Sequence, residues 1–271
     1  PLHLAECEKD CFFALETQKT KMIKQLHKQQ RDFDKSVIVL EDRIAAFKTE
    51  GNLEELVRLS ASAQDIDSAL SQMASAAADL NRREGLFGFT ATDYSAIDDV
   101  AADFEIFYKL WTSIADFQGQ RSTWLGGPFA ELDAKRLEAD VNDWWQFSGK
   151  AARSLEDDFP DAAAVAQTLR DETSEFKKLI PFVRCLASPA LKWWHWDDIS
   201  EIVGVSIELD ENLTLQWMLD QNIREFMGDI EDVSVKAEKE HNLVMQLEQM
   251  QAEWEEVVLE VKPHKETGTY I

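Results

Sequence analysis

Residues 23–47 read IKQLHKQQRDFDKSVIVLEDRIAAF, and their apolar side chains recur at steps of three, four or seven. That spacing gathers the apolar side chains into one stripe along a helix. We predict this helix over residues 5–50, which makes it roughly 60 Å long at about 1.5 Å per residue. The stripe consists of Ile23, Leu26, Phe33, Val37, Leu40, Ile44 and Phe47.

A second apolar stripe follows directly after the break at Gly51-Asn52. A short polar break between two long stripes predicts an antiparallel helical hairpin. The second stripe consists of Leu56, Leu59, Ala63, Ile66, Leu70, Met73, Ala77 and Leu80.

Further helices are predicted after the hairpin. Thr92 is a suitable N-cap for a third helix, and Asp133 for a fourth. Between them, residues 119–129 contain Gly126-Gly127-Pro128 and are predicted to be a loop. We take Gly126 and Gly127 as the candidate flexible joint of the chain.

The last third of the chain is also predicted to be helical. Pro189 fits the first turn of a short helix through Trp196 that closes at Gly204. A final helix is predicted from Val233 to Glu256, and the β-branched run over residues 257–261 predicts a short strand. The residues predicted to face inward on the final helix are Val233, Ala237, Val244, Leu247 and Trp254.

Together these patterns predict an all-α fold of elongated helical bundles. A long antiparallel helix hairpin comes first, helix bundles follow, and a short β-strand lies at the C-terminal end. The 10 glycines and 6 prolines among 271 residues are too few for a turn-rich β fold. The sequence begins without an initiator Met and ends just after a strand-like stretch, so we expect a piece of a longer protein.

The composition restricts the partners. A formal charge of −24 disfavours nucleic acid, anionic membranes and direct contact with the acidic microtubule surface. Proteins with basic or apolar faces are the expected partners. No apolar run approaches the length of a membrane span. The odd count of three cysteines fits a reducing compartment such as the cytoplasm.

Catalytic and metal-binding patterns are weak. Lys150 follows Gly149 without the glycine and hydroxyl residue that a phosphate-binding loop needs, so we expect no nucleotide site. His3, Cys7 and Cys11 lie four residues apart, too extended along one helix for a single zinc ion. Cys11 is expected to be a buried thiol. His195 lacks an evident catalytic partner and is expected to hold a structural hydrogen bond.

Four ordered motifs give the sequence a family resemblance. The stretch Asn81–Gly88, with Thr92-Asp93-Tyr94 and Tyr108–Trp111, resembles the junction of tail and linker in dynein heavy chains. Leu179–Phe182, Pro189–Leu191 and His195–Ile199 are similar to the linker signature of that family. The other two motifs, similar to a linker helix and to the strand-turn after it in axonemal dyneins, are Ala237–Trp254 and Lys265–Ile271.

The resemblance implies a division at residue 95. Residues 1–95 would form the C-terminal helical region of the tail, and residues 96–271 an incomplete N-terminal part of the linker. The residues carried over as structural signature positions are Trp111, Pro189, His195, Trp196, Gly204 and Trp254. Lys192-Trp193-Trp194 departs from the family, which usually has basic residues before the histidine.

The resemblance also implies a function. Dyneins are minus-end-directed microtubule motors whose ring of AAA+ modules binds ATP and Mg²⁺ and hydrolyses the ATP. The linker arches over the ring and passes its conformational change to the tail. This segment would be a lever without an enzymatic site or cofactor, located in the axoneme of a cilium or flagellum. Its partners would be its own ring and, through the tail, light and intermediate chains or other axonemal proteins, with microtubules contacted only indirectly.

Two alternatives remain open at the level of sequence. One is a structural helical-bundle protein, spectrin-like or tether-like, which should show a repeat near one hundred residues; none is visible. The other is a helical enzyme with a carboxylate metal site, for which the Glu-x-x-His spacing of Glu238 and His241 occurs once.

Overall fold

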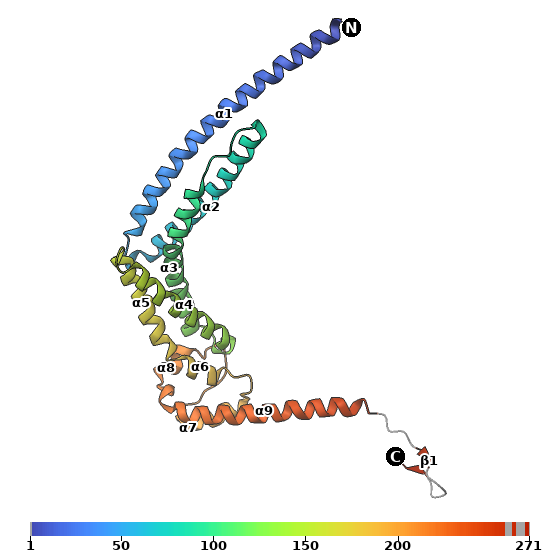
Figure 1. Cartoon of the computed structure of the whole chain (residues 1–271). Coiled ribbons are helices and arrows are strands. Elements are labelled where there is room, and N and C mark those ends of the chain that lie inside the picture. The colour runs from blue at the N-terminus through green and yellow to red at the C-terminus, as the bar shows by residue number, and fades with distance from the viewer. Residues whose placement is uncertain (1, 258–261, 264–268, 271) are drawn as a thin grey trace. The chain divides into compact units, whose positions relative to one another are not determined.

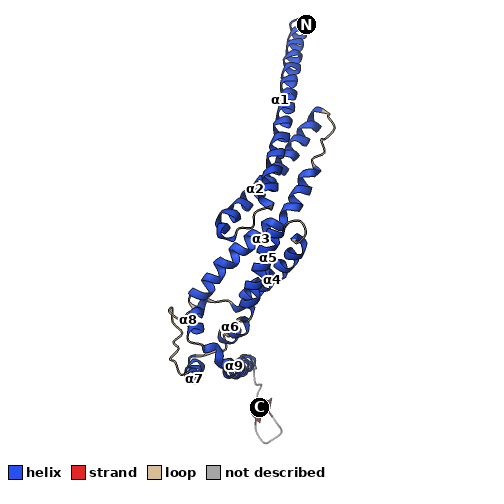
Figure 2. Ribbon diagram, turned by 90° about the vertical axis from the view of Figure 1, so that its left-hand side faces the viewer, coloured by secondary structure: helices blue, strands red, loops and turns tan. Residues whose placement is uncertain are grey.

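The computed structural model describes residues 2–257, 262–263 and 269–270, and the side chains of residues 7–257. These residues are mostly helical (Figure 2), so the all-α prediction is confirmed. The longer helices are α1 (Leu2–Lys48), α2 (Leu56–Phe87), α3 (Ser95–Gly126), α4 (Ala134–Leu155), α5 (Pro160–Lys177) and α9 (Met227–Glu255). The shorter ones are α6 (Ile180–Leu186), α7 (Trp193–Val203) and α8 (Leu215–Asp220), with 3-10 turns η1 (Leu53–Glu55), η2 (Phe129–Glu131) and η3 (Ile223–Phe226).

Two very short strands lie near the C-terminus. β1 (Lys262–Pro263) and β2 (Thr269–Tyr270) pair antiparallel, with Lys262 opposite Tyr270. The strand predicted over residues 257–261 falls, from residue 258 on, outside the described residues.

The chain divides into two compact units. Unit 1 comprises Pro1–Gly119 and Asn142–Ser174, and unit 2 comprises Gln120–Val141 and Glu175–Ile271. The helices α3, α4 and α5 each supply residues to both units. The units do not coincide with residues 1–95 and 96–271, so the boundary between tail and linker stays a prediction.

Unit 1 is built on the hairpin of α1 and α2, which Figures 1 and 2 show side by side. Arg43 reaches Asp65 at 3.9 Å, while Arg83 donates to Gln29 at 2.5 Å, so the two helices run antiparallel. The predicted hairpin is therefore confirmed. Its core contains Leu26, Phe33, Ala77, Leu80 and Ile97, with Val37, Met73, Phe87 and Tyr94 packed against them.

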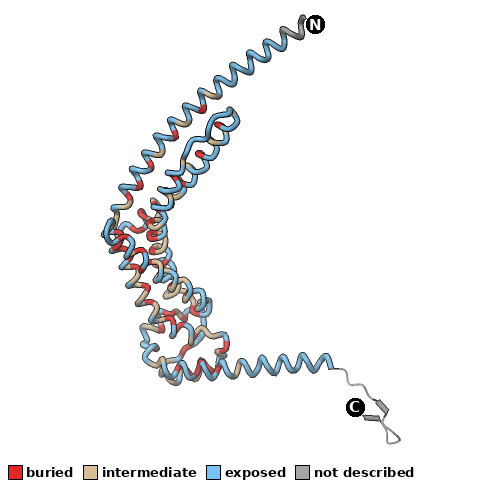
Figure 3. The backbone as a smooth tube through the Cα atoms, viewed as in Figure 1, coloured by how far each residue is buried: buried red, intermediate tan, exposed pale blue. Residues whose placement is uncertain are grey.

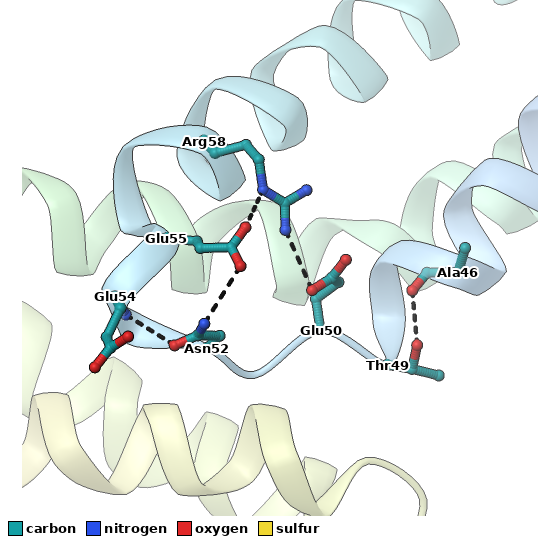
Figure 4. A network of polar contacts seen from close by, with 7 residues as sticks. All are labelled: Ala46, Thr49, Glu50, Asn52, Glu54, Glu55 and Arg58. Carbon is teal, nitrogen blue, oxygen red and sulfur yellow. Dashed lines mark hydrogen bonds and ion pairs between the residues drawn. The ribbon is translucent and has the colours of Figure 1, made fainter.

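The turn of the hairpin is fixed by polar contacts (Figure 4). The Asn52 side chain accepts from the Glu54 amide at 3.0 Å, which caps η1. Arg58 pairs with Glu50 at 3.3 Å and also with Glu55, joining both sides of the break. A Cβ at Gly51 would lie 2.5 Å from the Cβ of Asp161 on α5, so close packing requires glycine there.

Aromatic rings continue the core of unit 1 beyond the hairpin. Trp111 is fully buried and packs edge-on against Phe47 at a centroid distance of 6.4 Å. Phe107 packs in the same way on Phe159, at 5.0 Å. The Lys48 ammonium lies over both of these phenylalanine rings, at 5.5 and 5.8 Å. Large rings at these contacts bury much apolar area and stabilise the helices against one another.

Unit 2 packs its short helices around the first half of α9. The helices α6 and α7 both contact α9, and η3 contacts α7, α8 and α9. Its buried residues include Phe182, Val183, Leu186, Trp196, Ile199, Leu215, Met218, Ile223, Ile230 and Ala237.

Three predictions about helix ends need correction. Residues 119–129 are not a loop, because α3 continues to Gly126. Glycine costs a helix only about 1 kcal/mol, and packing after Gly119, where the Trp124 ring lies 5.4 Å from that of Phe176, outweighs that cost. Pro189 lies in a turn before α7, which begins at Trp193 rather than at the proline. The final helix begins at Met227, six residues before the predicted Val233.

Two predictions about helix ends are confirmed. Gly204 closes α7 with a left-handed φ of 75°, where glycine avoids the steric strain of a side chain. Asp133 caps α4, since its carboxylate accepts from the amides of Lys135 and Arg136 at 3.0 and 3.1 Å.

Candidate functional site

The predicted signature residues fall into three places. Pro189, His195, Trp196 and Gly204 lie in or next to α7, in unit 2. Trp111 belongs to the core of unit 1, and Trp254 lies near the end of α9. Four of the six signature positions therefore lie in or next to one helix, and we centre the candidate site on α7.

His195 connects α7 to α9. Its side chain is 1% exposed, and its Nδ1 accepts from the backbone N–H of Lys192 at 3.0 Å. A neutral imidazole that accepts at Nδ1 carries its hydrogen on Nε2. Nε2 then donates to Oε2 of Glu240 at 3.1 Å. Because Nε2 carries a hydrogen, it cannot accept a hydrogen bond from the Trp194 indole nitrogen, which lies 3.2 Å away. Trp194 and His195 therefore contact each other through their rings.

Two further polar contacts hold the first half of α9. Lys236 pairs with Asp198 of α7 at 3.5 Å, and Ser234 donates to the carbonyl of Cys185 in α6 at 3.2 Å. Burial raises the pKa of the Cys185 thiol, so the thiol stays protonated at neutral pH. These contacts fix α6 and α7 on α9 as far as Glu240.

Trp196 connects the same helix to the segment that follows α3. It is 5% exposed and packs edge-on against Phe129 at 6.4 Å. The Phe129 amide donates to the carbonyl of Leu213 at 2.7 Å. Phe129 follows Gly127 by two residues, so the candidate joint and the His-Trp helix share a packing residue.

The two glycines of the candidate joint differ in their surroundings. Gly126 is the last residue of α3, and a Cβ there would meet nothing within 4 Å. The Gly127 amide donates to the Thr123 carbonyl at 2.8 Å, and a Cβ on Gly127 would lie 2.7 Å from that oxygen. A hollow of about 270 Å³ opens beside them, lined in part by Pro128, Arg136 and Asp140.

Trp254 and its neighbours contradict the predicted inward face of α9. Val233 and Ala237 are buried as predicted, but Val244, Leu247 and Trp254 are 50%, 63% and 67% exposed. Figure 3 shows the change along the helix, from buried residues near α7 to an exposed second half. Periodicity shows which residues share a face, but it does not show where the covering helices end.

Sequence reasoning missed Glu84, a carboxylate only 4% exposed in the hairpin. It accepts from Gln30 on α1 at 2.5 Å, and from the amide and hydroxyl of Thr92 at 2.8 and 2.6 Å. The Thr92 hydroxyl is the main cause that holds the pKa of Glu84 below its ordinary value. The prediction that Thr92 is the N-cap of α3 is therefore wrong. The Asp93 carboxylate instead accepts from the amide of Ser95, at 3.0 Å.

A signal for Glu84 was present in the sequence. It follows Ala77 and Leu80 at steps of three and four, so it occupies a position of the apolar stripe. A carboxylate at such a position needs hydrogen-bond donors, because an unpaired buried charge is strongly destabilising. Gln30 and Thr92 supply them.

The contacts at this site are ring packing and hydrogen bonds between helices. No three His, Cys, Asp or Glu side chains converge as metal ligands in the described part of the chain. Cys11, predicted to be buried, is exposed, as is Cys7, and the side chain of His3 lies outside the described residues. Among the described helices, none combines the length and hydropathy that a membrane crossing requires.

Comparison with known proteins gives consistent matches. Residues 97–271 match the family described as "Dynein heavy chain, N-terminal region 2". Dynein axonemal heavy chain 1 of Rattus norvegicus is 27% identical over 242 residues, 89% of this chain and 5% of the relative. The Mus musculus protein of the same name is 30% identical over 191 residues, 70% of this chain and 4% of the relative.

A related heavy chain also matches. Dynein axonemal heavy chain 3 of Homo sapiens is 26% identical over 192 residues, 71% of this chain and 5% of the relative. The chain thus spans about a twentieth of the length of these curated relatives. Because the family match covers more than half of the chain, and continues through all of unit 2, the chain belongs to the dynein heavy chain family.

Proposed function

We propose that this segment is a lever between the tail and the linker of an axonemal dynein heavy chain. It would pass an ATP-driven conformational change from the AAA+ ring of the whole protein to the tail. The relatives are axonemal heavy chains, and we place this chain in the cytoskeleton of the cilium or flagellum. Residues 1–95 would belong to the tail and residues 96–271 to the linker.

The lever proposal rests on the construction of unit 1. α1 packs on α2 through its own buried residues from Leu26 to Phe47. At the end of this packed part, the Phe47 ring contacts the Trp111 ring. An arm that transmits force must resist bending, and interdigitated side chains along a long helix pair resist it better than loops.

The proposal assigns no catalytic residue or cofactor to this segment. ATP and Mg²⁺ would bind in the ring of the whole chain. The expected contacts of the segment are that ring and other axonemal dynein components, including light or intermediate chains. Microtubules would be reached only through the rest of the motor.

The test uses the full heavy chain with Trp111→Ala, and Trp111→Phe as its matched control. The alanine leaves a cavity that costs about 3–5 kcal/mol, so the arm should yield under load. We expect slower microtubule gliding by Trp111→Ala with basal ATPase unchanged. The phenylalanine variant should keep both rates, because the Trp111 Nε1 has no hydrogen-bond partner among the described residues.

The candidate joint is tested in the same assay. Gly127→Ala forces a Cβ against the Thr123 carbonyl, whereas Gly126→Ala meets open space. If this segment acts as a joint, Gly127→Ala slows gliding without changing basal ATPase, and Gly126→Ala changes neither.

Two outcomes contradict the lever. One is an equal fall of gliding and ATPase in folded Trp111→Ala protein, which would place the defect in the motor cycle. The other is unchanged gliding under load, which would favour a static tether. Circular dichroism of each variant shows whether its helices are intact, and Trp111→Leu provides a milder cavity where the alanine variant unfolds.

A further inference from the structure

A basic stretch stands out on α1 in this acidic chain. Between Thr17 and Arg31 the sequence contains Lys or Arg at five positions and no Asp or Glu, although the chain has 52 acidic and only 28 basic residues. Apart from Lys19, its basic residues and Lys35, which follows Asp32 and Asp34, fall at alternating steps of three and four. This basic stripe consists of Lys21, Lys24, Lys28, Arg31 and Lys35, all exposed.

The basic stripe lies on the face of α1 opposite α2. Leu26, fully buried in the hairpin core, marks the inward direction. At about 100° per residue, the five basic positions lie roughly 140–220° around the helix from Leu26. The hairpin therefore leaves the five residues of the stripe exposed, and Figure 3 shows α1 as mostly exposed with separate buried positions.

The stripe also differs from other basic residues in its pairing. None of its five members forms an ion pair with a carboxylate of the described residues, and Arg31 donates only to the His27 carbonyl of its own helix. Elsewhere in the described chain, basic residues commonly find a carboxylate. Such pairs are Arg43–Asp65, Lys48–Asp103, Arg58–Glu50, Arg82–Asp79, Lys109–Glu105, Arg136–Asp140, Lys178–Glu175 and Lys236–Asp198.

Apolar side chains stand at both ends of the stripe on the same face. Phe13 is 76% exposed at one end, and Ile38 and Val39 are 57% and 68% exposed at the other. The distance from Phe13 to Val39 is about 39 Å at 1.5 Å per residue. A row of cations between two apolar contacts, along one helix, matches the surface of another helix.

We propose that the basic stripe is a docking surface for an acidic amphipathic helix of a partner protein. The partner would carry Asp or Glu at steps of three and four, so that its carboxylates face the stripe, and apolar residues near both ends to contact Phe13 and Ile38. The apolar ends fix the register, while the ion pairs give charge specificity.

The rest of the chain favours a helix over larger polyanions. A nucleic acid duplex or an anionic bilayer extends well beyond the stripe and meets the negative field of a protein of charge −24. A single helix touches the stripe alone. This inference concerns an added interface and does not depend on the lever role.

The test measures binding of a synthetic acidic peptide to the 271-residue chain and to the full heavy chain. The peptide is helical, about 26 residues long to match the ridge, with Glu facing the stripe and Leu at each end. The variant Lys24→Gln, Lys28→Gln, Arg31→Gln keeps helix propensity. The control Lys135→Gln, Lys150→Gln, Lys239→Gln removes the same charge at exposed positions elsewhere.

We expect the stripe variant to bind the peptide about tenfold more weakly and the control variant to bind it as the parent does. Added salt should weaken parent binding, and Phe13→Ser should weaken it further. Equal binding by parent and stripe variant, or no binding at low salt, would overturn the proposal. So would stripe-dependent self-association in sedimentation, or tighter stripe-dependent binding of phosphatidylserine vesicles or duplex DNA than of the peptide.

Discussion

The two long terminal helices, α1 and α9, are each only half covered, but their exposed halves differ in chemistry. On α9 the buried stripe of Ile230, Val233 and Ala237 continues as exposed apolar residues. On α1 the inward stripe also continues before Leu26 as exposed apolar residues, namely Met22, Leu15 and Phe12. The exposed halves differ in charge instead, because α1 carries the basic stripe, whereas residues 241–257 contain four Glu and no Lys or Arg. The exposed residues that continue the α9 stripe, or lie beside it, are Leu243, Val244, Leu247, Met250 and Trp254.

The two helices therefore differ in charge but not in the inward stripe, which stays apolar on both where its cover ends. A stripe that stays apolar keeps unfavourable surface exposed, for which the described residues provide no cover. The residue at which the covering helices end should therefore be measurable on α1 and on α9. Substitutions on its covered side should lower the free energy of unfolding much more than substitutions on its exposed side.

The largest difference in stability loss between a covered and an exposed position is expected on α1. Leu26→Ala should lower the free energy of unfolding by about 2–5 kcal/mol, because it removes a fully buried side chain. Leu15→Ala, at a position 68% exposed, should change it by less than about 0.5 kcal/mol. Urea unfolding of the purified chain followed by helix signal gives both values. Similar costs at the two positions would mean that residues before Leu26 are covered in solution.

Glu84 tests the point at which α1 leaves the hairpin. Glu84→Gln keeps the shape but removes the charge that Thr92 and Gln30 donate to, so we expect a loss of about 2 kcal/mol at neutral pH. The folded-state pKa of Glu84 is lowered from 4.5, so its stabilisation is present above that value and is lost as the pH falls through the folded pKa. Parent and variant should therefore converge in stability in acid.

A pH series of urea midpoints measures this convergence. A difference between parent and Glu84→Gln that stays constant from neutral pH into acid would show that the carboxylate charge is not what the donors recognise. Thr92→Val is the matched control, since it removes the hydroxyl that chiefly lowers the pKa of Glu84 and should reduce the pH dependence.

Much of the fold could be predicted because its signals are local. The stripes of α1 and α2, the break at Gly51 and the closing glycine Gly204 each depend on spacing or on one backbone conformation. The continuation of α3 past Gly119 could not be predicted in this way. It depends on tertiary packing, such as that of Trp124 on Phe176 at 5.4 Å, which outweighs local propensity.

The site was predicted less completely. His195 was expected to hold a structural hydrogen bond, and it does, but its partner Glu240 is 45 residues away and no spacing rule connects them. Glu84 carried a signal, as a carboxylate in an apolar stripe, that became clear only with its donors. The net charge of −24 concealed the basic stripe, because a whole-chain sum averages over local faces.

The smallest expected difference in stability loss lies on α9, where the same substitution of valine by alanine can be made in the covered half and in the exposed half. Val233→Ala removes two methyl groups from a side chain 9% exposed, so we expect a loss of about 1.5 kcal/mol. Val244→Ala makes the same change at 50% exposure, where the better helix propensity of alanine offsets the lost contact, leaving less than about 0.5 kcal/mol. Urea midpoints of the two variants, compared in the 271-residue chain, locate the end of the cover. If Val244→Ala were as costly as Val233→Ala, the second half of α9 would be packed in solution, and α9 would not be half covered as α1 is. In the full heavy chain, a rise in the cost of Val244→Ala alone would show that residues beyond this segment cover the apolar half.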